Sequence, residues 1–600
     1  MRVLVTGADG LLGSNLVREL LAKDHSVRCL ICPGSRSVTL DGLPAEKVEG
    51  DICDESFSLS DAMAGCDGVF HCAAITDLWA DAERVWKVNL EGTRRVLDAC
   101  LAVPIKRLVF VSSASCFEPG PISAPGGETG AFPEAYRGTP YMESKYRATE
   151  LVRQYASTRG LDAVIVAPTF LLGPYDSRPS GGELVRQFIQ RPMAFTAPGG
   201  RSFACAPDVA RAMLSAMEKG RTGQTYILGG HNLCYRDFFS RVARIAGVRA
   251  PKRTLPGSVI RLAGTMASLF GSVVGKRPKL NRSVARFSLL GAYYSSAKAT
   301  DELGARQSPV ETGIEDSIRS LSTYGHLQMD GGYFKGKVAL VTGGSRGVGF
   351  ATARALALRG AKVVIAARGE TRLGEAKDHI ERLGGKVVAI AGDVANLADA
   401  ERMVQDAIDH FGRLDVVINN AGLSMRGQFA ELCPEVCRQV TATNFIGCLN
   451  VSQASIGHLI DSKGQLVFIS SIAGLFGLPG ASVYCATKKA LTGLAESLRI
   501  ELIPKGVHVG VVYLGFTEHD PEKRIITADG SLAPPGRPAH HSQAQAAALI
   551  VKLLKKRKRQ LIMTSAGVAG WLAYRLSPAF VERAILRAQA SEWRIFKRFS

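Results

Sequence analysis

Hydrophobic positions along this chain gather in short runs, and the pattern that opens the chain returns later. Met1–Thr6 and Ser26–Ile31 are mainly apolar and predict buried strands, with a glycine turn and the start of a helix between them. A strand, a helix and a second strand in this order predict a parallel βαβ unit. The same order begins again at Val338–Thr342, so the chain starts a βαβ series twice.

This double start predicts two domains of one fold class. A chain of 600 residues also exceeds what one hydrophobic core usually supports. We expect an α/β protein of two tandem Rossmann-type domains, each a doubly wound parallel sheet covered by helices. The first should occupy residues 1–322, with a smaller C-terminal substrate lobe at about residues 173–296. A linker at residues 323–334 should precede the second domain at residues 335–600, whose end, about residues 550–600, predicts a basic amphipathic tail.

A glycine-rich turn follows the first strand of each half. Turn glycines let backbone N–H groups approach a pyrophosphate, and the helix that follows presents its positive end to it. The first turn has the spacing G-x-x-G-x-x-G and the second G-x-x-x-G-x-G, so the halves are not a recent duplication. The residues expected to contact the cofactor are Gly7, Gly10 and Gly13 in the first turn and Gly343, Ser345, Arg346, Gly347 and Gly349 in the second.

The end of the second strand of each half bears on the choice between NAD and NADP. An acidic residue there holds the ribose 2′-hydroxyl of NAD, and an arginine favours the 2′-phosphate of NADP. In the first half the strand ends in ICPGSR, whose Arg36 either reaches a phosphate or is a solvated loop residue, so NAD(H) or NADP(H) is expected. In the second half Arg346 and Arg368 are two cations with no acid competing, and guanidinium–phosphate pairing predicts NADP(H).

A tyrosine and a lysine four residues apart are the candidate catalytic pair of each half. Residues i and i+4 share a helix face, so the Lys145 ammonium should lie near the Tyr141 phenol. A tyrosine normally has a pKa of about 10, and a neighbouring cation lowers it toward the working range of an acid–base catalyst. The second pair is Tyr484 and Lys488, and the two tyrosines follow the first glycines of their turns by 134 and 141 residues, which chance explains poorly.

The first half resembles an extended short-chain dehydrogenase/reductase. Besides the glycine turn, this likeness rests on the segments HCAA, NLEGT, YMESK and APTFLLGP. Within that type, the first half is similar to the dihydroflavonol-reductase, 3β-hydroxysteroid-dehydrogenase and hopanoid-associated epimerase-like branch. The resemblance implies that Ser113 binds the reacting oxygen, Tyr141 transfers the proton and Lys145 holds the ribose. Ser115 is the competing choice for Ser113, because CFEPG replaces the usual V-Y-G after the serine. By the same likeness the cofactor is flanked by Asp51, Ala73 and Pro168.

The second half resembles compact short-chain dehydrogenases/reductases. Intervals of 27 residues from Asn444 to Ser471 and of 13 from Ser471 to Tyr484 match that type. The resemblance implies that Ser471 polarises the substrate carbonyl, Tyr484 donates its proton, and Lys488 lowers the tyrosine pKa and binds the ribose. Asn444 would hold a water that relays protons. By the same likeness the cofactor also contacts Asp393, Asn420, Gly422 and Thr517.

The charge of the chain changes the picture of its partners. A formal net charge of +20 favours an anionic partner. Pro256–Leu290 (with Lys276, Arg277 and Lys279) and the segment after Lys552 mix cationic and apolar residues, which predicts either a basic packed face or a surface resting on lipid headgroups. Nucleic acid is not expected, because no recognised binding fold accompanies the charge.

The cysteines and the apolar runs bear on the location of the protein. The 13 cysteines are scattered singly, without the spacing of a metal site, and no secretory leader precedes the first strand. No apolar run is long enough to predict a spanning helix. We therefore expect a cytoplasmic protein. If its basic apolar segments contact lipid, it would bind peripherally to the inner face of the membrane.

Together these patterns predict a two-site NAD(P)-dependent oxidoreductase. It would interconvert ketone and secondary alcohol on a lipophilic substrate of steroid, hopanoid or sphingoid type, the substrate class that a similarity of the second half to 3-ketodihydrosphingosine reductases and 11β-hydroxysteroid-dehydrogenase-like proteins implies. Two alternatives stay open for the first half: a nucleotide-sugar-like epimerase or dehydratase, or a non-catalytic module that binds cofactor or lipid and regulates the second half. Compact-type relatives commonly form dimers or tetramers, so a homo-oligomer is also expected.

Overall fold

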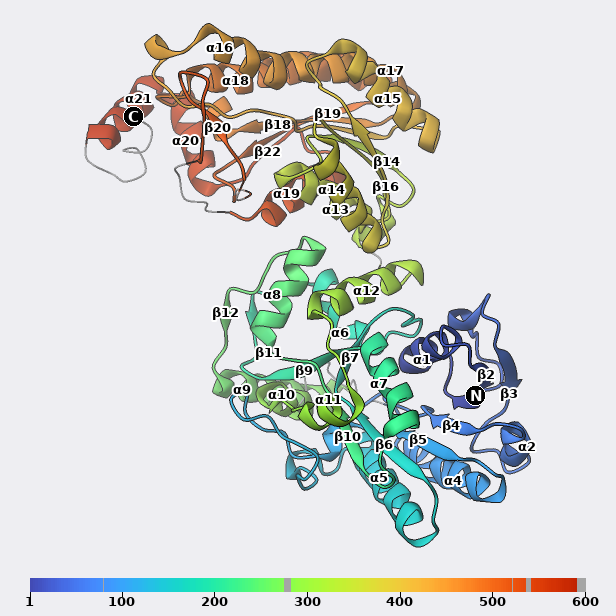
Figure 1. The fold of residues 1–600 in the computed structure, drawn as a ribbon. Coiled ribbons are helices and arrows are strands. Elements are labelled where there is room, and N and C mark those ends of the chain that lie inside the picture. The colour runs from blue at the N-terminus through green and yellow to red at the C-terminus, as the bar shows by residue number, and fades with distance from the viewer. Residues whose placement is uncertain are drawn as a thin grey trace. The chain divides into compact units, whose positions relative to one another are not determined.

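The chain forms two compact units (Figure 1). The structure is a computed structural model that describes residues 1–78, 80–274, 282–327, 329–518, 520, 522–535 and 541–590. The first unit contains Met1–Ile245 and Ala250–His326, and the second contains Ala246–Arg249 and Leu327–Ser600.

The first unit is organised around a seven-stranded sheet in which all neighbouring strands are parallel. The strands are β1 (Arg2–Thr6), β2 (Ser26–Ile31), β3 (Glu46–Glu49), β4 (Gly68–His71), β5 (Arg107–Val111), β6 (Ala163–Pro168) and β10 (Thr225–Leu228). Their order is β3-β2-β1-β4-β5-β6-β10, so the chain winds outward from β1 in both directions. Ligands of such sheets bind outside the carboxyl ends of the strands where the order reverses, here between β1 and β4.

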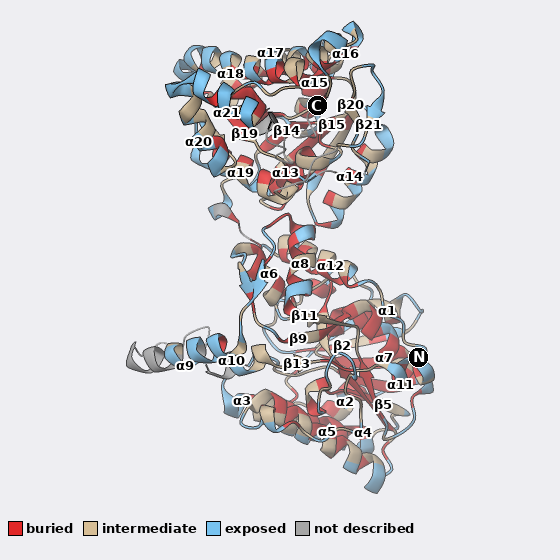
Figure 2. Cartoon of the chain, turned by 90° about the vertical axis from the view of Figure 1, so that its left-hand side faces the viewer, coloured by how far each residue is buried: buried red, intermediate tan, exposed pale blue. Residues whose placement is uncertain are grey.

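Helices cover both faces of this sheet because successive strand residues point to opposite sides. Val3 and Val5 pack with one helix group, and Leu4 packs with the other. The first group is α1 (Leu11–Leu21), α7 (Ala206–Lys219) and α11 (Ala297–Leu303). The second group is α2 (Leu59–Met63), α4 (Gly92–Ala102) and α5 (Pro140–Thr158), with α3 (Ala82–Trp86) between α2 and α4 in the chain. Figure 2 shows buried residues concentrated in the strands.

The smaller lobe of the first unit is discontinuous in sequence. Its short strands are β7 (Phe170–Leu172), β8 (Phe195–Thr196), β9 (Gly200–Cys205), β11 (His231–Cys234), β12 (Arg253–Thr254) and β13 (Gly291–Ala292). Its helices are α6 (Gly182–Gln190), α8 (Tyr235–Ala246), α9 (Gly257–Val274) and α10 (Arg282–Leu289), and α12 (Val310–Thr323) packs against α6. The expectation of one continuous lobe at about residues 173–296 needs correction, because α7, which packs on the main sheet, and β10, which is its edge strand, interrupt it.

The second unit repeats the architecture with a second seven-stranded parallel sheet. Its strands are β14 (Val338–Thr342), β15 (Lys362–Ala367), β16 (Lys386–Ala391), β17 (Val416–Asn419), β18 (Gln465–Ser471), β19 (His508–Leu514) and β22 (Gln560–Ile562), in the order β16-β15-β14-β17-β18-β19-β22. One face packs against α13 (Gly347–Ala357), α14 (Glu370–Arg382) and α19 (Gln543–Lys556), and the other against α15 (Leu397–Phe411), α17 (Gly447–Ser462) and α18 (Ser482–Leu502). The remaining elements are α16 (Pro434–Thr441), the hairpin β20 (Ile525–Ile526) and β21 (Leu532–Ala533), α20 (Ser565–Leu576) and α21 (Pro578–Ala590).

The expected tail begins later than the charge pattern predicts. Ile550, Val551, Leu553 and Leu554 are buried in the core that also contains α13, and β22 is a strand of the main sheet. The cationic run therefore belongs to a helix that is packed in the core, and of the residues described after β22 the helical ones form α20 and α21. Lys276, Arg277 and Lys279 and residues 591–600 lie outside the described part of the chain. Within the described part, no helix is both long and apolar enough to cross a bilayer.

Candidate active sites

The first glycine of each turn lets the chain pass tightly over the end of the neighbouring strand. Gly7 and Gly343 have φ angles of +65° and +63°, where a side chain is strained. A Cβ on Gly7 would lie 2.8 Å from the Cα of Ala73, and one on Gly343 would lie 3.0 Å from the Cα of Ala421. Each turn therefore lies at the switch point of its sheet.

The last glycine of each turn brings the following helix close. A Cβ on Gly13 would lie 2.2 Å from the carbonyl oxygen of Gly7, and one on Gly349 would lie 2.1 Å from that of Gly343. The amino ends of α1 and α13 therefore meet the turns directly. A Cβ on Gly10 would contact only the Gly7 oxygen, at 3.4 Å. Because Gly10 has no side chain, the space above its backbone is open and fits a pyrophosphate.

Hydrogen bonds join each glycine turn to the end of the neighbouring strand. The Thr6 and Thr342 hydroxyls accept hydrogen bonds from the backbone N–H groups of Ala73 (3.2 Å) and Ala421 (3.0 Å). The Asn420 amide donates to the carbonyl of Thr342 at 2.9 Å. A Cβ on Gly422 would lie 3.2 Å from the Asn444 amide oxygen and 3.3 Å from the Lys488 amine. Asn420 and Gly422 thus lie between the glycine turn and the candidate catalytic groups.

The two predicted lysines are buried and held in the same way. The Lys145 ammonium donates to the Val111 carbonyl at 2.5 Å, and that of Lys488 to the Ile469 carbonyl at 2.9 Å. Each accepting carbonyl belongs to the residue two places before the candidate serine. Burial lowers the pKa of Lys145 to about 8.

The structure brings Ser113 and Tyr141 together. The Ser113 hydroxyl is a hydrogen-bond partner of the Tyr141 phenol, whereas Ser115 bonds to Ser113 at 2.8 Å. Burial raises the pKa of Tyr141, and the bond to Ser113 opposes that rise only in part. The expectation that Lys145 lowers this pKa is wrong for the structure, because the ammonium is directed at Val111.

The second unit has a corresponding arrangement on β18 and α18. The Ser471 hydroxyl accepts a hydrogen bond from the backbone N–H of Ala473 at 3.2 Å, at the end of β18. Tyr484 and Lys488 lie one turn apart on α18, with the Lys488 nitrogen 5.9 Å from the centroid of the Tyr484 ring. All three side chains therefore come from the carboxyl edge of the sheet and the first two turns of one helix.

Two buried asparagines hydrogen-bond to the backbone of the loops beside the candidate catalytic residues, one in each unit. Asn444 lies in a π-helical turn (Ala442–Ile446), accepts from the N–H of Leu423 at 2.7 Å, and donates to its carbonyl and to the Thr487 hydroxyl. Both of its amide hydrogens are thereby used, so a water could bond only to Oδ1 or to the main-chain carbonyl. This restricts the expected role of Asn444 in proton relay.

Asn89 is the equivalent residue of the first unit and was not predicted as a site residue. It lies in a π-helical turn (Lys87–Glu91) and bonds to the N–H (2.8 Å) and carbonyl (3.0 Å) of Ile75 and to the Ser144 hydroxyl (3.0 Å). Ser144 directly precedes Lys145, as Thr487 precedes Lys488. The NLEGT segment was the signal in the sequence, but its role depends on contacts distant in the chain.

The adenosine side of the second site contains an acid that the sequence did not lead us to expect beside its two arginines. Arg368 and Arg346 are exposed near the ends of β15 and β14, but the Arg368 guanidinium pairs with Asp393 at 3.6 Å. An acid therefore does compete for one of the two cations. Asp393 also accepts from the backbone N–H of Ala395 at 3.0 Å, as Asp51 accepts from that of Cys53 at 2.8 Å in the first unit.

An open cavity of about 660 Å³ lies at the carboxyl ends of β2 and β3 in the first unit. Asp51 and Cys32 are among its lining residues, and Arg36 is exposed in the loop after β2. Its position is where the adenosine half of a dinucleotide lies in this fold. The remaining lining residues are Pro33, Cys53, Asp54, Glu55 and Lys87.

The nicotinamide side of each site follows the sixth strand of its unit in chain order, β6 or β19. Pro168 ends β6, and among the described residues the buried hydroxyl of Thr169 has no hydrogen-bond partner. Such an orphaned hydroxyl fits a polar ligand group, for example a carboxamide. Thr517 is buried after β19, and its hydroxyl donates to the Gly515 carbonyl at 3.1 Å. Thr169 was not predicted as a site residue. Within the described residues, no cluster of three His, Cys, Asp or Glu side chains could hold a metal ion.

Comparisons with known proteins assign a family to each half. The family described as "NAD dependent epimerase/dehydratase family" matches residues 3–229, and "short chain dehydrogenase" matches residues 337–529. "Sterol demethylase protein B" of Methylococcus capsulatus is 30% identical over 327 residues, which are 53% of this chain and 97% of that protein. "Ketoacyl reductase HetN" of Nostoc is 32% identical over 229 residues, 38% of this chain and 78% of that protein. "11-beta-hydroxysteroid dehydrogenase-like 4A" of Arabidopsis thaliana is 40% identical over 187 residues, 31% of this chain and 62% of that protein.

Proposed function

Because the chain belongs to the short-chain dehydrogenases/reductases, with an NAD-dependent epimerase/dehydratase unit followed by a short-chain dehydrogenase unit, we propose that it is a two-site enzyme interconverting ketones and secondary alcohols. It is an NAD(P)-dependent oxidoreductase. The observation that carries the proposal is the recurrence, in both units, of a serine, a tyrosine and a buried lysine at the carboxyl edge beside a glycine turn.

In the second site we assign the proton transfer to Tyr484. The Ser471 hydroxyl donates to the substrate carbonyl oxygen and so favours its developing negative charge. The Tyr484 phenol gives its proton to that oxygen in reduction and takes it back in oxidation. The Lys488 ammonium holds the ribose and stabilises the phenolate left behind. When bound, the nicotinamide cofactor supplies or accepts the hydride. In the first site Ser113 and Tyr141 take the same roles, and Lys145 would hold the ribose.

The second site is proposed to take NADP(H). Arg346 and Arg368 supply two guanidinium groups beside the ends of β14 and β15. Arg368 would exchange Asp393, an exposed partner at 3.6 Å, for a 2′-phosphate. An exposed ion pair contributes about 0–1 kcal/mol, so this exchange costs little against a charge-assisted bond to phosphate.

The substrate is proposed to be lipophilic. A cavity of about 280 Å³ lies between the loop after Ser471, α18, α20 and α21, and Phe476, Tyr574, Val581 and Ile585 are among its apolar lining residues. Ala473 and Cys485 in its wall are close in sequence to Ser471 and Tyr484. The names of two relatives, which refer to sterol and to hydroxysteroid, support the same class.

Separate loss of the two cofactor sites tests the proposal. The intact chain should bind two dinucleotides, and Gly349→Ala should weaken binding at the NADPH-preferring site while Gly13→Ala weakens binding at the other. A methyl forced against a backbone oxygen costs about 1–3 kcal/mol, or about 10–100-fold in affinity. NADH and NADPH fluorescence titrations of the full chain measure both sites.

A glycine without neighbours provides the control for these two variants. A Cβ on Gly374, in α14, would meet no atom within 4 Å, so Gly374→Ala should leave both affinities unchanged. Circular dichroism melting should show that the Gly13 and Gly349 variants remain folded. Binding of only one dinucleotide by the intact chain would contradict a two-site enzyme.

We also propose that α20 and α21 rest on an anionic lipid surface. Val568, Leu572 and Leu576 are spaced by four residues on α20 and are exposed, Leu576 to 87%, and Phe580 and Leu586 are exposed on α21. Apolar side chains beside cations are typical of interfacial helices. The cationic residues on these helices are Arg575, Arg583 and Arg587. In the first unit Val259, Leu262 and Met266 form a similar exposed stripe on α9.

Vesicle sedimentation tests the lipid surface. The chain should sediment with vesicles containing phosphatidylglycerol and less with pure phosphatidylcholine. Because burying one large apolar side chain is worth about 1.5–3 kcal/mol, the double variant Leu576→Ser, Phe580→Ser should weaken binding by about 100-fold or more. The matched control is Ile500→Ser, which removes an exposed residue of α18 and should not alter sedimentation. Equal sedimentation of the double variant would contradict the proposal.

A further inference from the structure

An acidic side chain in the first glycine turn occupies the space between β1 and the end of β2. The Asp9 side chain is only 9% exposed, and its Oδ2 accepts hydrogen bonds from the Ser35 hydroxyl at 2.5 Å and the Arg178 guanidinium at 2.7 Å. Ser35 lies in the loop that follows β2. The carboxylate thus bridges the turn to the end of β2, where the adenosine ribose of a dinucleotide lies in this fold.

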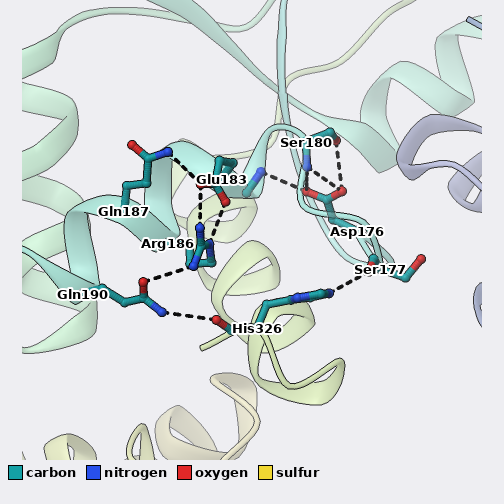
Figure 3. Close-up of polar contacts among 9 residues, drawn as sticks. Asp176, Ser177, Ser180, Glu183, Arg186, Gln187, Gln190 and His326 are labelled. Atoms are coloured by element: carbon teal, nitrogen blue, oxygen red, sulfur yellow. Dashed lines mark hydrogen bonds and ion pairs between the residues drawn. The ribbon is translucent and has the colours of Figure 1, made fainter. Parts of the chain in front are cut away.

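The loop that carries Arg178 is held in place on both sides (Figure 3). Asp176 is buried and accepts from the backbone N–H groups of Ser180 and Gly182, at 3.0 and 2.9 Å, and from the Ser180 hydroxyl. The His326 Nε2 donates to the Ser177 carbonyl at 2.7 Å. The pair of Arg178 with Asp9 is therefore a feature of an ordered loop rather than a chance surface contact.

The two units differ at this position in that only the first has a carboxylate in its glycine turn, Asp9, which is paired with Arg178. The second unit has the guanidinium of Arg346 in its turn and that of Arg368 after its second strand. The first has the carboxylate of Asp9 and the thiol of Cys32. Burial raises the pKa of Cys32, and among the weaker influences Asp9 raises it and Arg178 lowers it, so both charges act at the end of β2.

We propose that Asp9 makes the first site selective for NAD(H), with its carboxylate accepting the ribose 2′-hydroxyl and opposing a 2′-phosphate. Among the described residues, both side-chain bonds of Asp9 end on Oδ2, so Oδ1 is available to a hydroxyl donor. A phosphate has no proton to donate there and would face the carboxylate at close range. Arg178 does not reverse this, because turning toward a phosphate would leave the Asp9 carboxylate, only 9% exposed, without its charge partner, whereas Asp393 is 37% exposed to water when Arg368 leaves it.

This selectivity rests on the proposed function, since it requires the first unit to bind a dinucleotide. If the second site takes NADP(H), one chain would then draw on two different cofactors. Hydride transfer at one site would not compete for cofactor with hydride transfer at the other. Oxidation at one site and reduction at the other could therefore proceed together.

The test uses the full chain carrying Gly349→Ala, so that fluorescence titration reports the first site. NADH should bind at least about tenfold more tightly than NADPH, and Asp9→Asn should reduce that ratio about tenfold, mainly by improving NADPH binding. Asn keeps the shape of Asp and removes its charge. The matched control is Asp41→Asn, which removes an exposed carboxylate paired with Lys47 and should leave the ratio unchanged.

The possible outcomes distinguish a failure of the proposed Asp9 selectivity from a failure of dinucleotide binding by the first unit. If the unmodified site binds NADPH as tightly as NADH, or if Asp9→Asn leaves the ratio unchanged, the role of Asp9 is overturned while the two-site enzyme stands. If the first site binds neither dinucleotide, the proposed function of that unit fails. Calorimetry on the chain without the Gly349 change gives a second readout: NADPH should fill one site, and two after Asp9→Asn.

Discussion

Replacing Tyr484 with phenylalanine is expected to lower the rate of NADPH-dependent ketone reduction by about 10²–10⁴-fold, the usual contribution of a positioned proton donor. Phenylalanine keeps the ring that lies 5.9 Å from the Lys488 nitrogen and removes only the hydroxyl. NADPH should bind as before, because the glycine turn and both arginines are untouched. The loss of NADPH absorbance with a 3-ketosteroid, together with a fluorescence titration, measures the two quantities separately.

A second tyrosine of the same unit provides the control for Tyr484. The Tyr513 hydroxyl hydrogen-bonds with that of Thr492 at 3.0 Å, so Tyr513→Phe should cost about 1 kcal/mol of stability and leave the reduction rate unchanged. If the Tyr484→Phe protein reduced the ketone at the rate of the unmodified chain, Tyr484 would not be the proton donor.

Replacing Tyr141 with phenylalanine should have an effect of similar size on the first site. In a chain that already carries Tyr484→Phe, the turnover that remains belongs to the first unit, and Tyr141→Phe should reduce it by about 10²–10⁴-fold. The phenol hydrogen-bonds with Ser113, and its burial raises its pKa, so it carries a proton that it can donate. Reduction of a ketone by NADH, followed as the loss of NADH absorbance, measures the effect.

This measurement also decides between the alternatives for the first unit. Tyr155→Phe is the matched control, because Tyr155 lies on the same helix and donates to Asp98 at 2.7 Å. Conversion of a nucleotide sugar without net change in NADH would indicate an epimerase or dehydratase. No loss of any turnover after Tyr141→Phe would indicate a non-catalytic module.

Much of the fold and part of the sites could be predicted because the signals are local. The glycine turns each lie within one strand-to-helix junction, and the tyrosine–lysine pairs lie within two turns of one helix. A pattern of this kind is complete within a few residues, so periodicity and spacing identify it. The tail illustrates the limit: charge predicted a basic amphipathic tail from about residue 550, but burial of Leu553 and Leu554 and the pairing of β22 with β19 place its beginning in the core.

The sequence by itself determined that the chain is two parallel α/β units, each with a glycine turn and a serine, tyrosine and lysine in a recognisable order. Only the tertiary structure decided what these groups face: the buried lysines donate to Val111 and Ile469, and Asn89 clamps Ile75. It also decided that Asp9 meets Arg178, a residue 169 positions away. The physical reason is that strand and helix signals arise between near neighbours, whereas a side chain's partner depends on where distant loops return. The contacts of the Asp9 carboxylate, which we propose selects NAD(H) in the first site, are therefore decided by the tertiary structure.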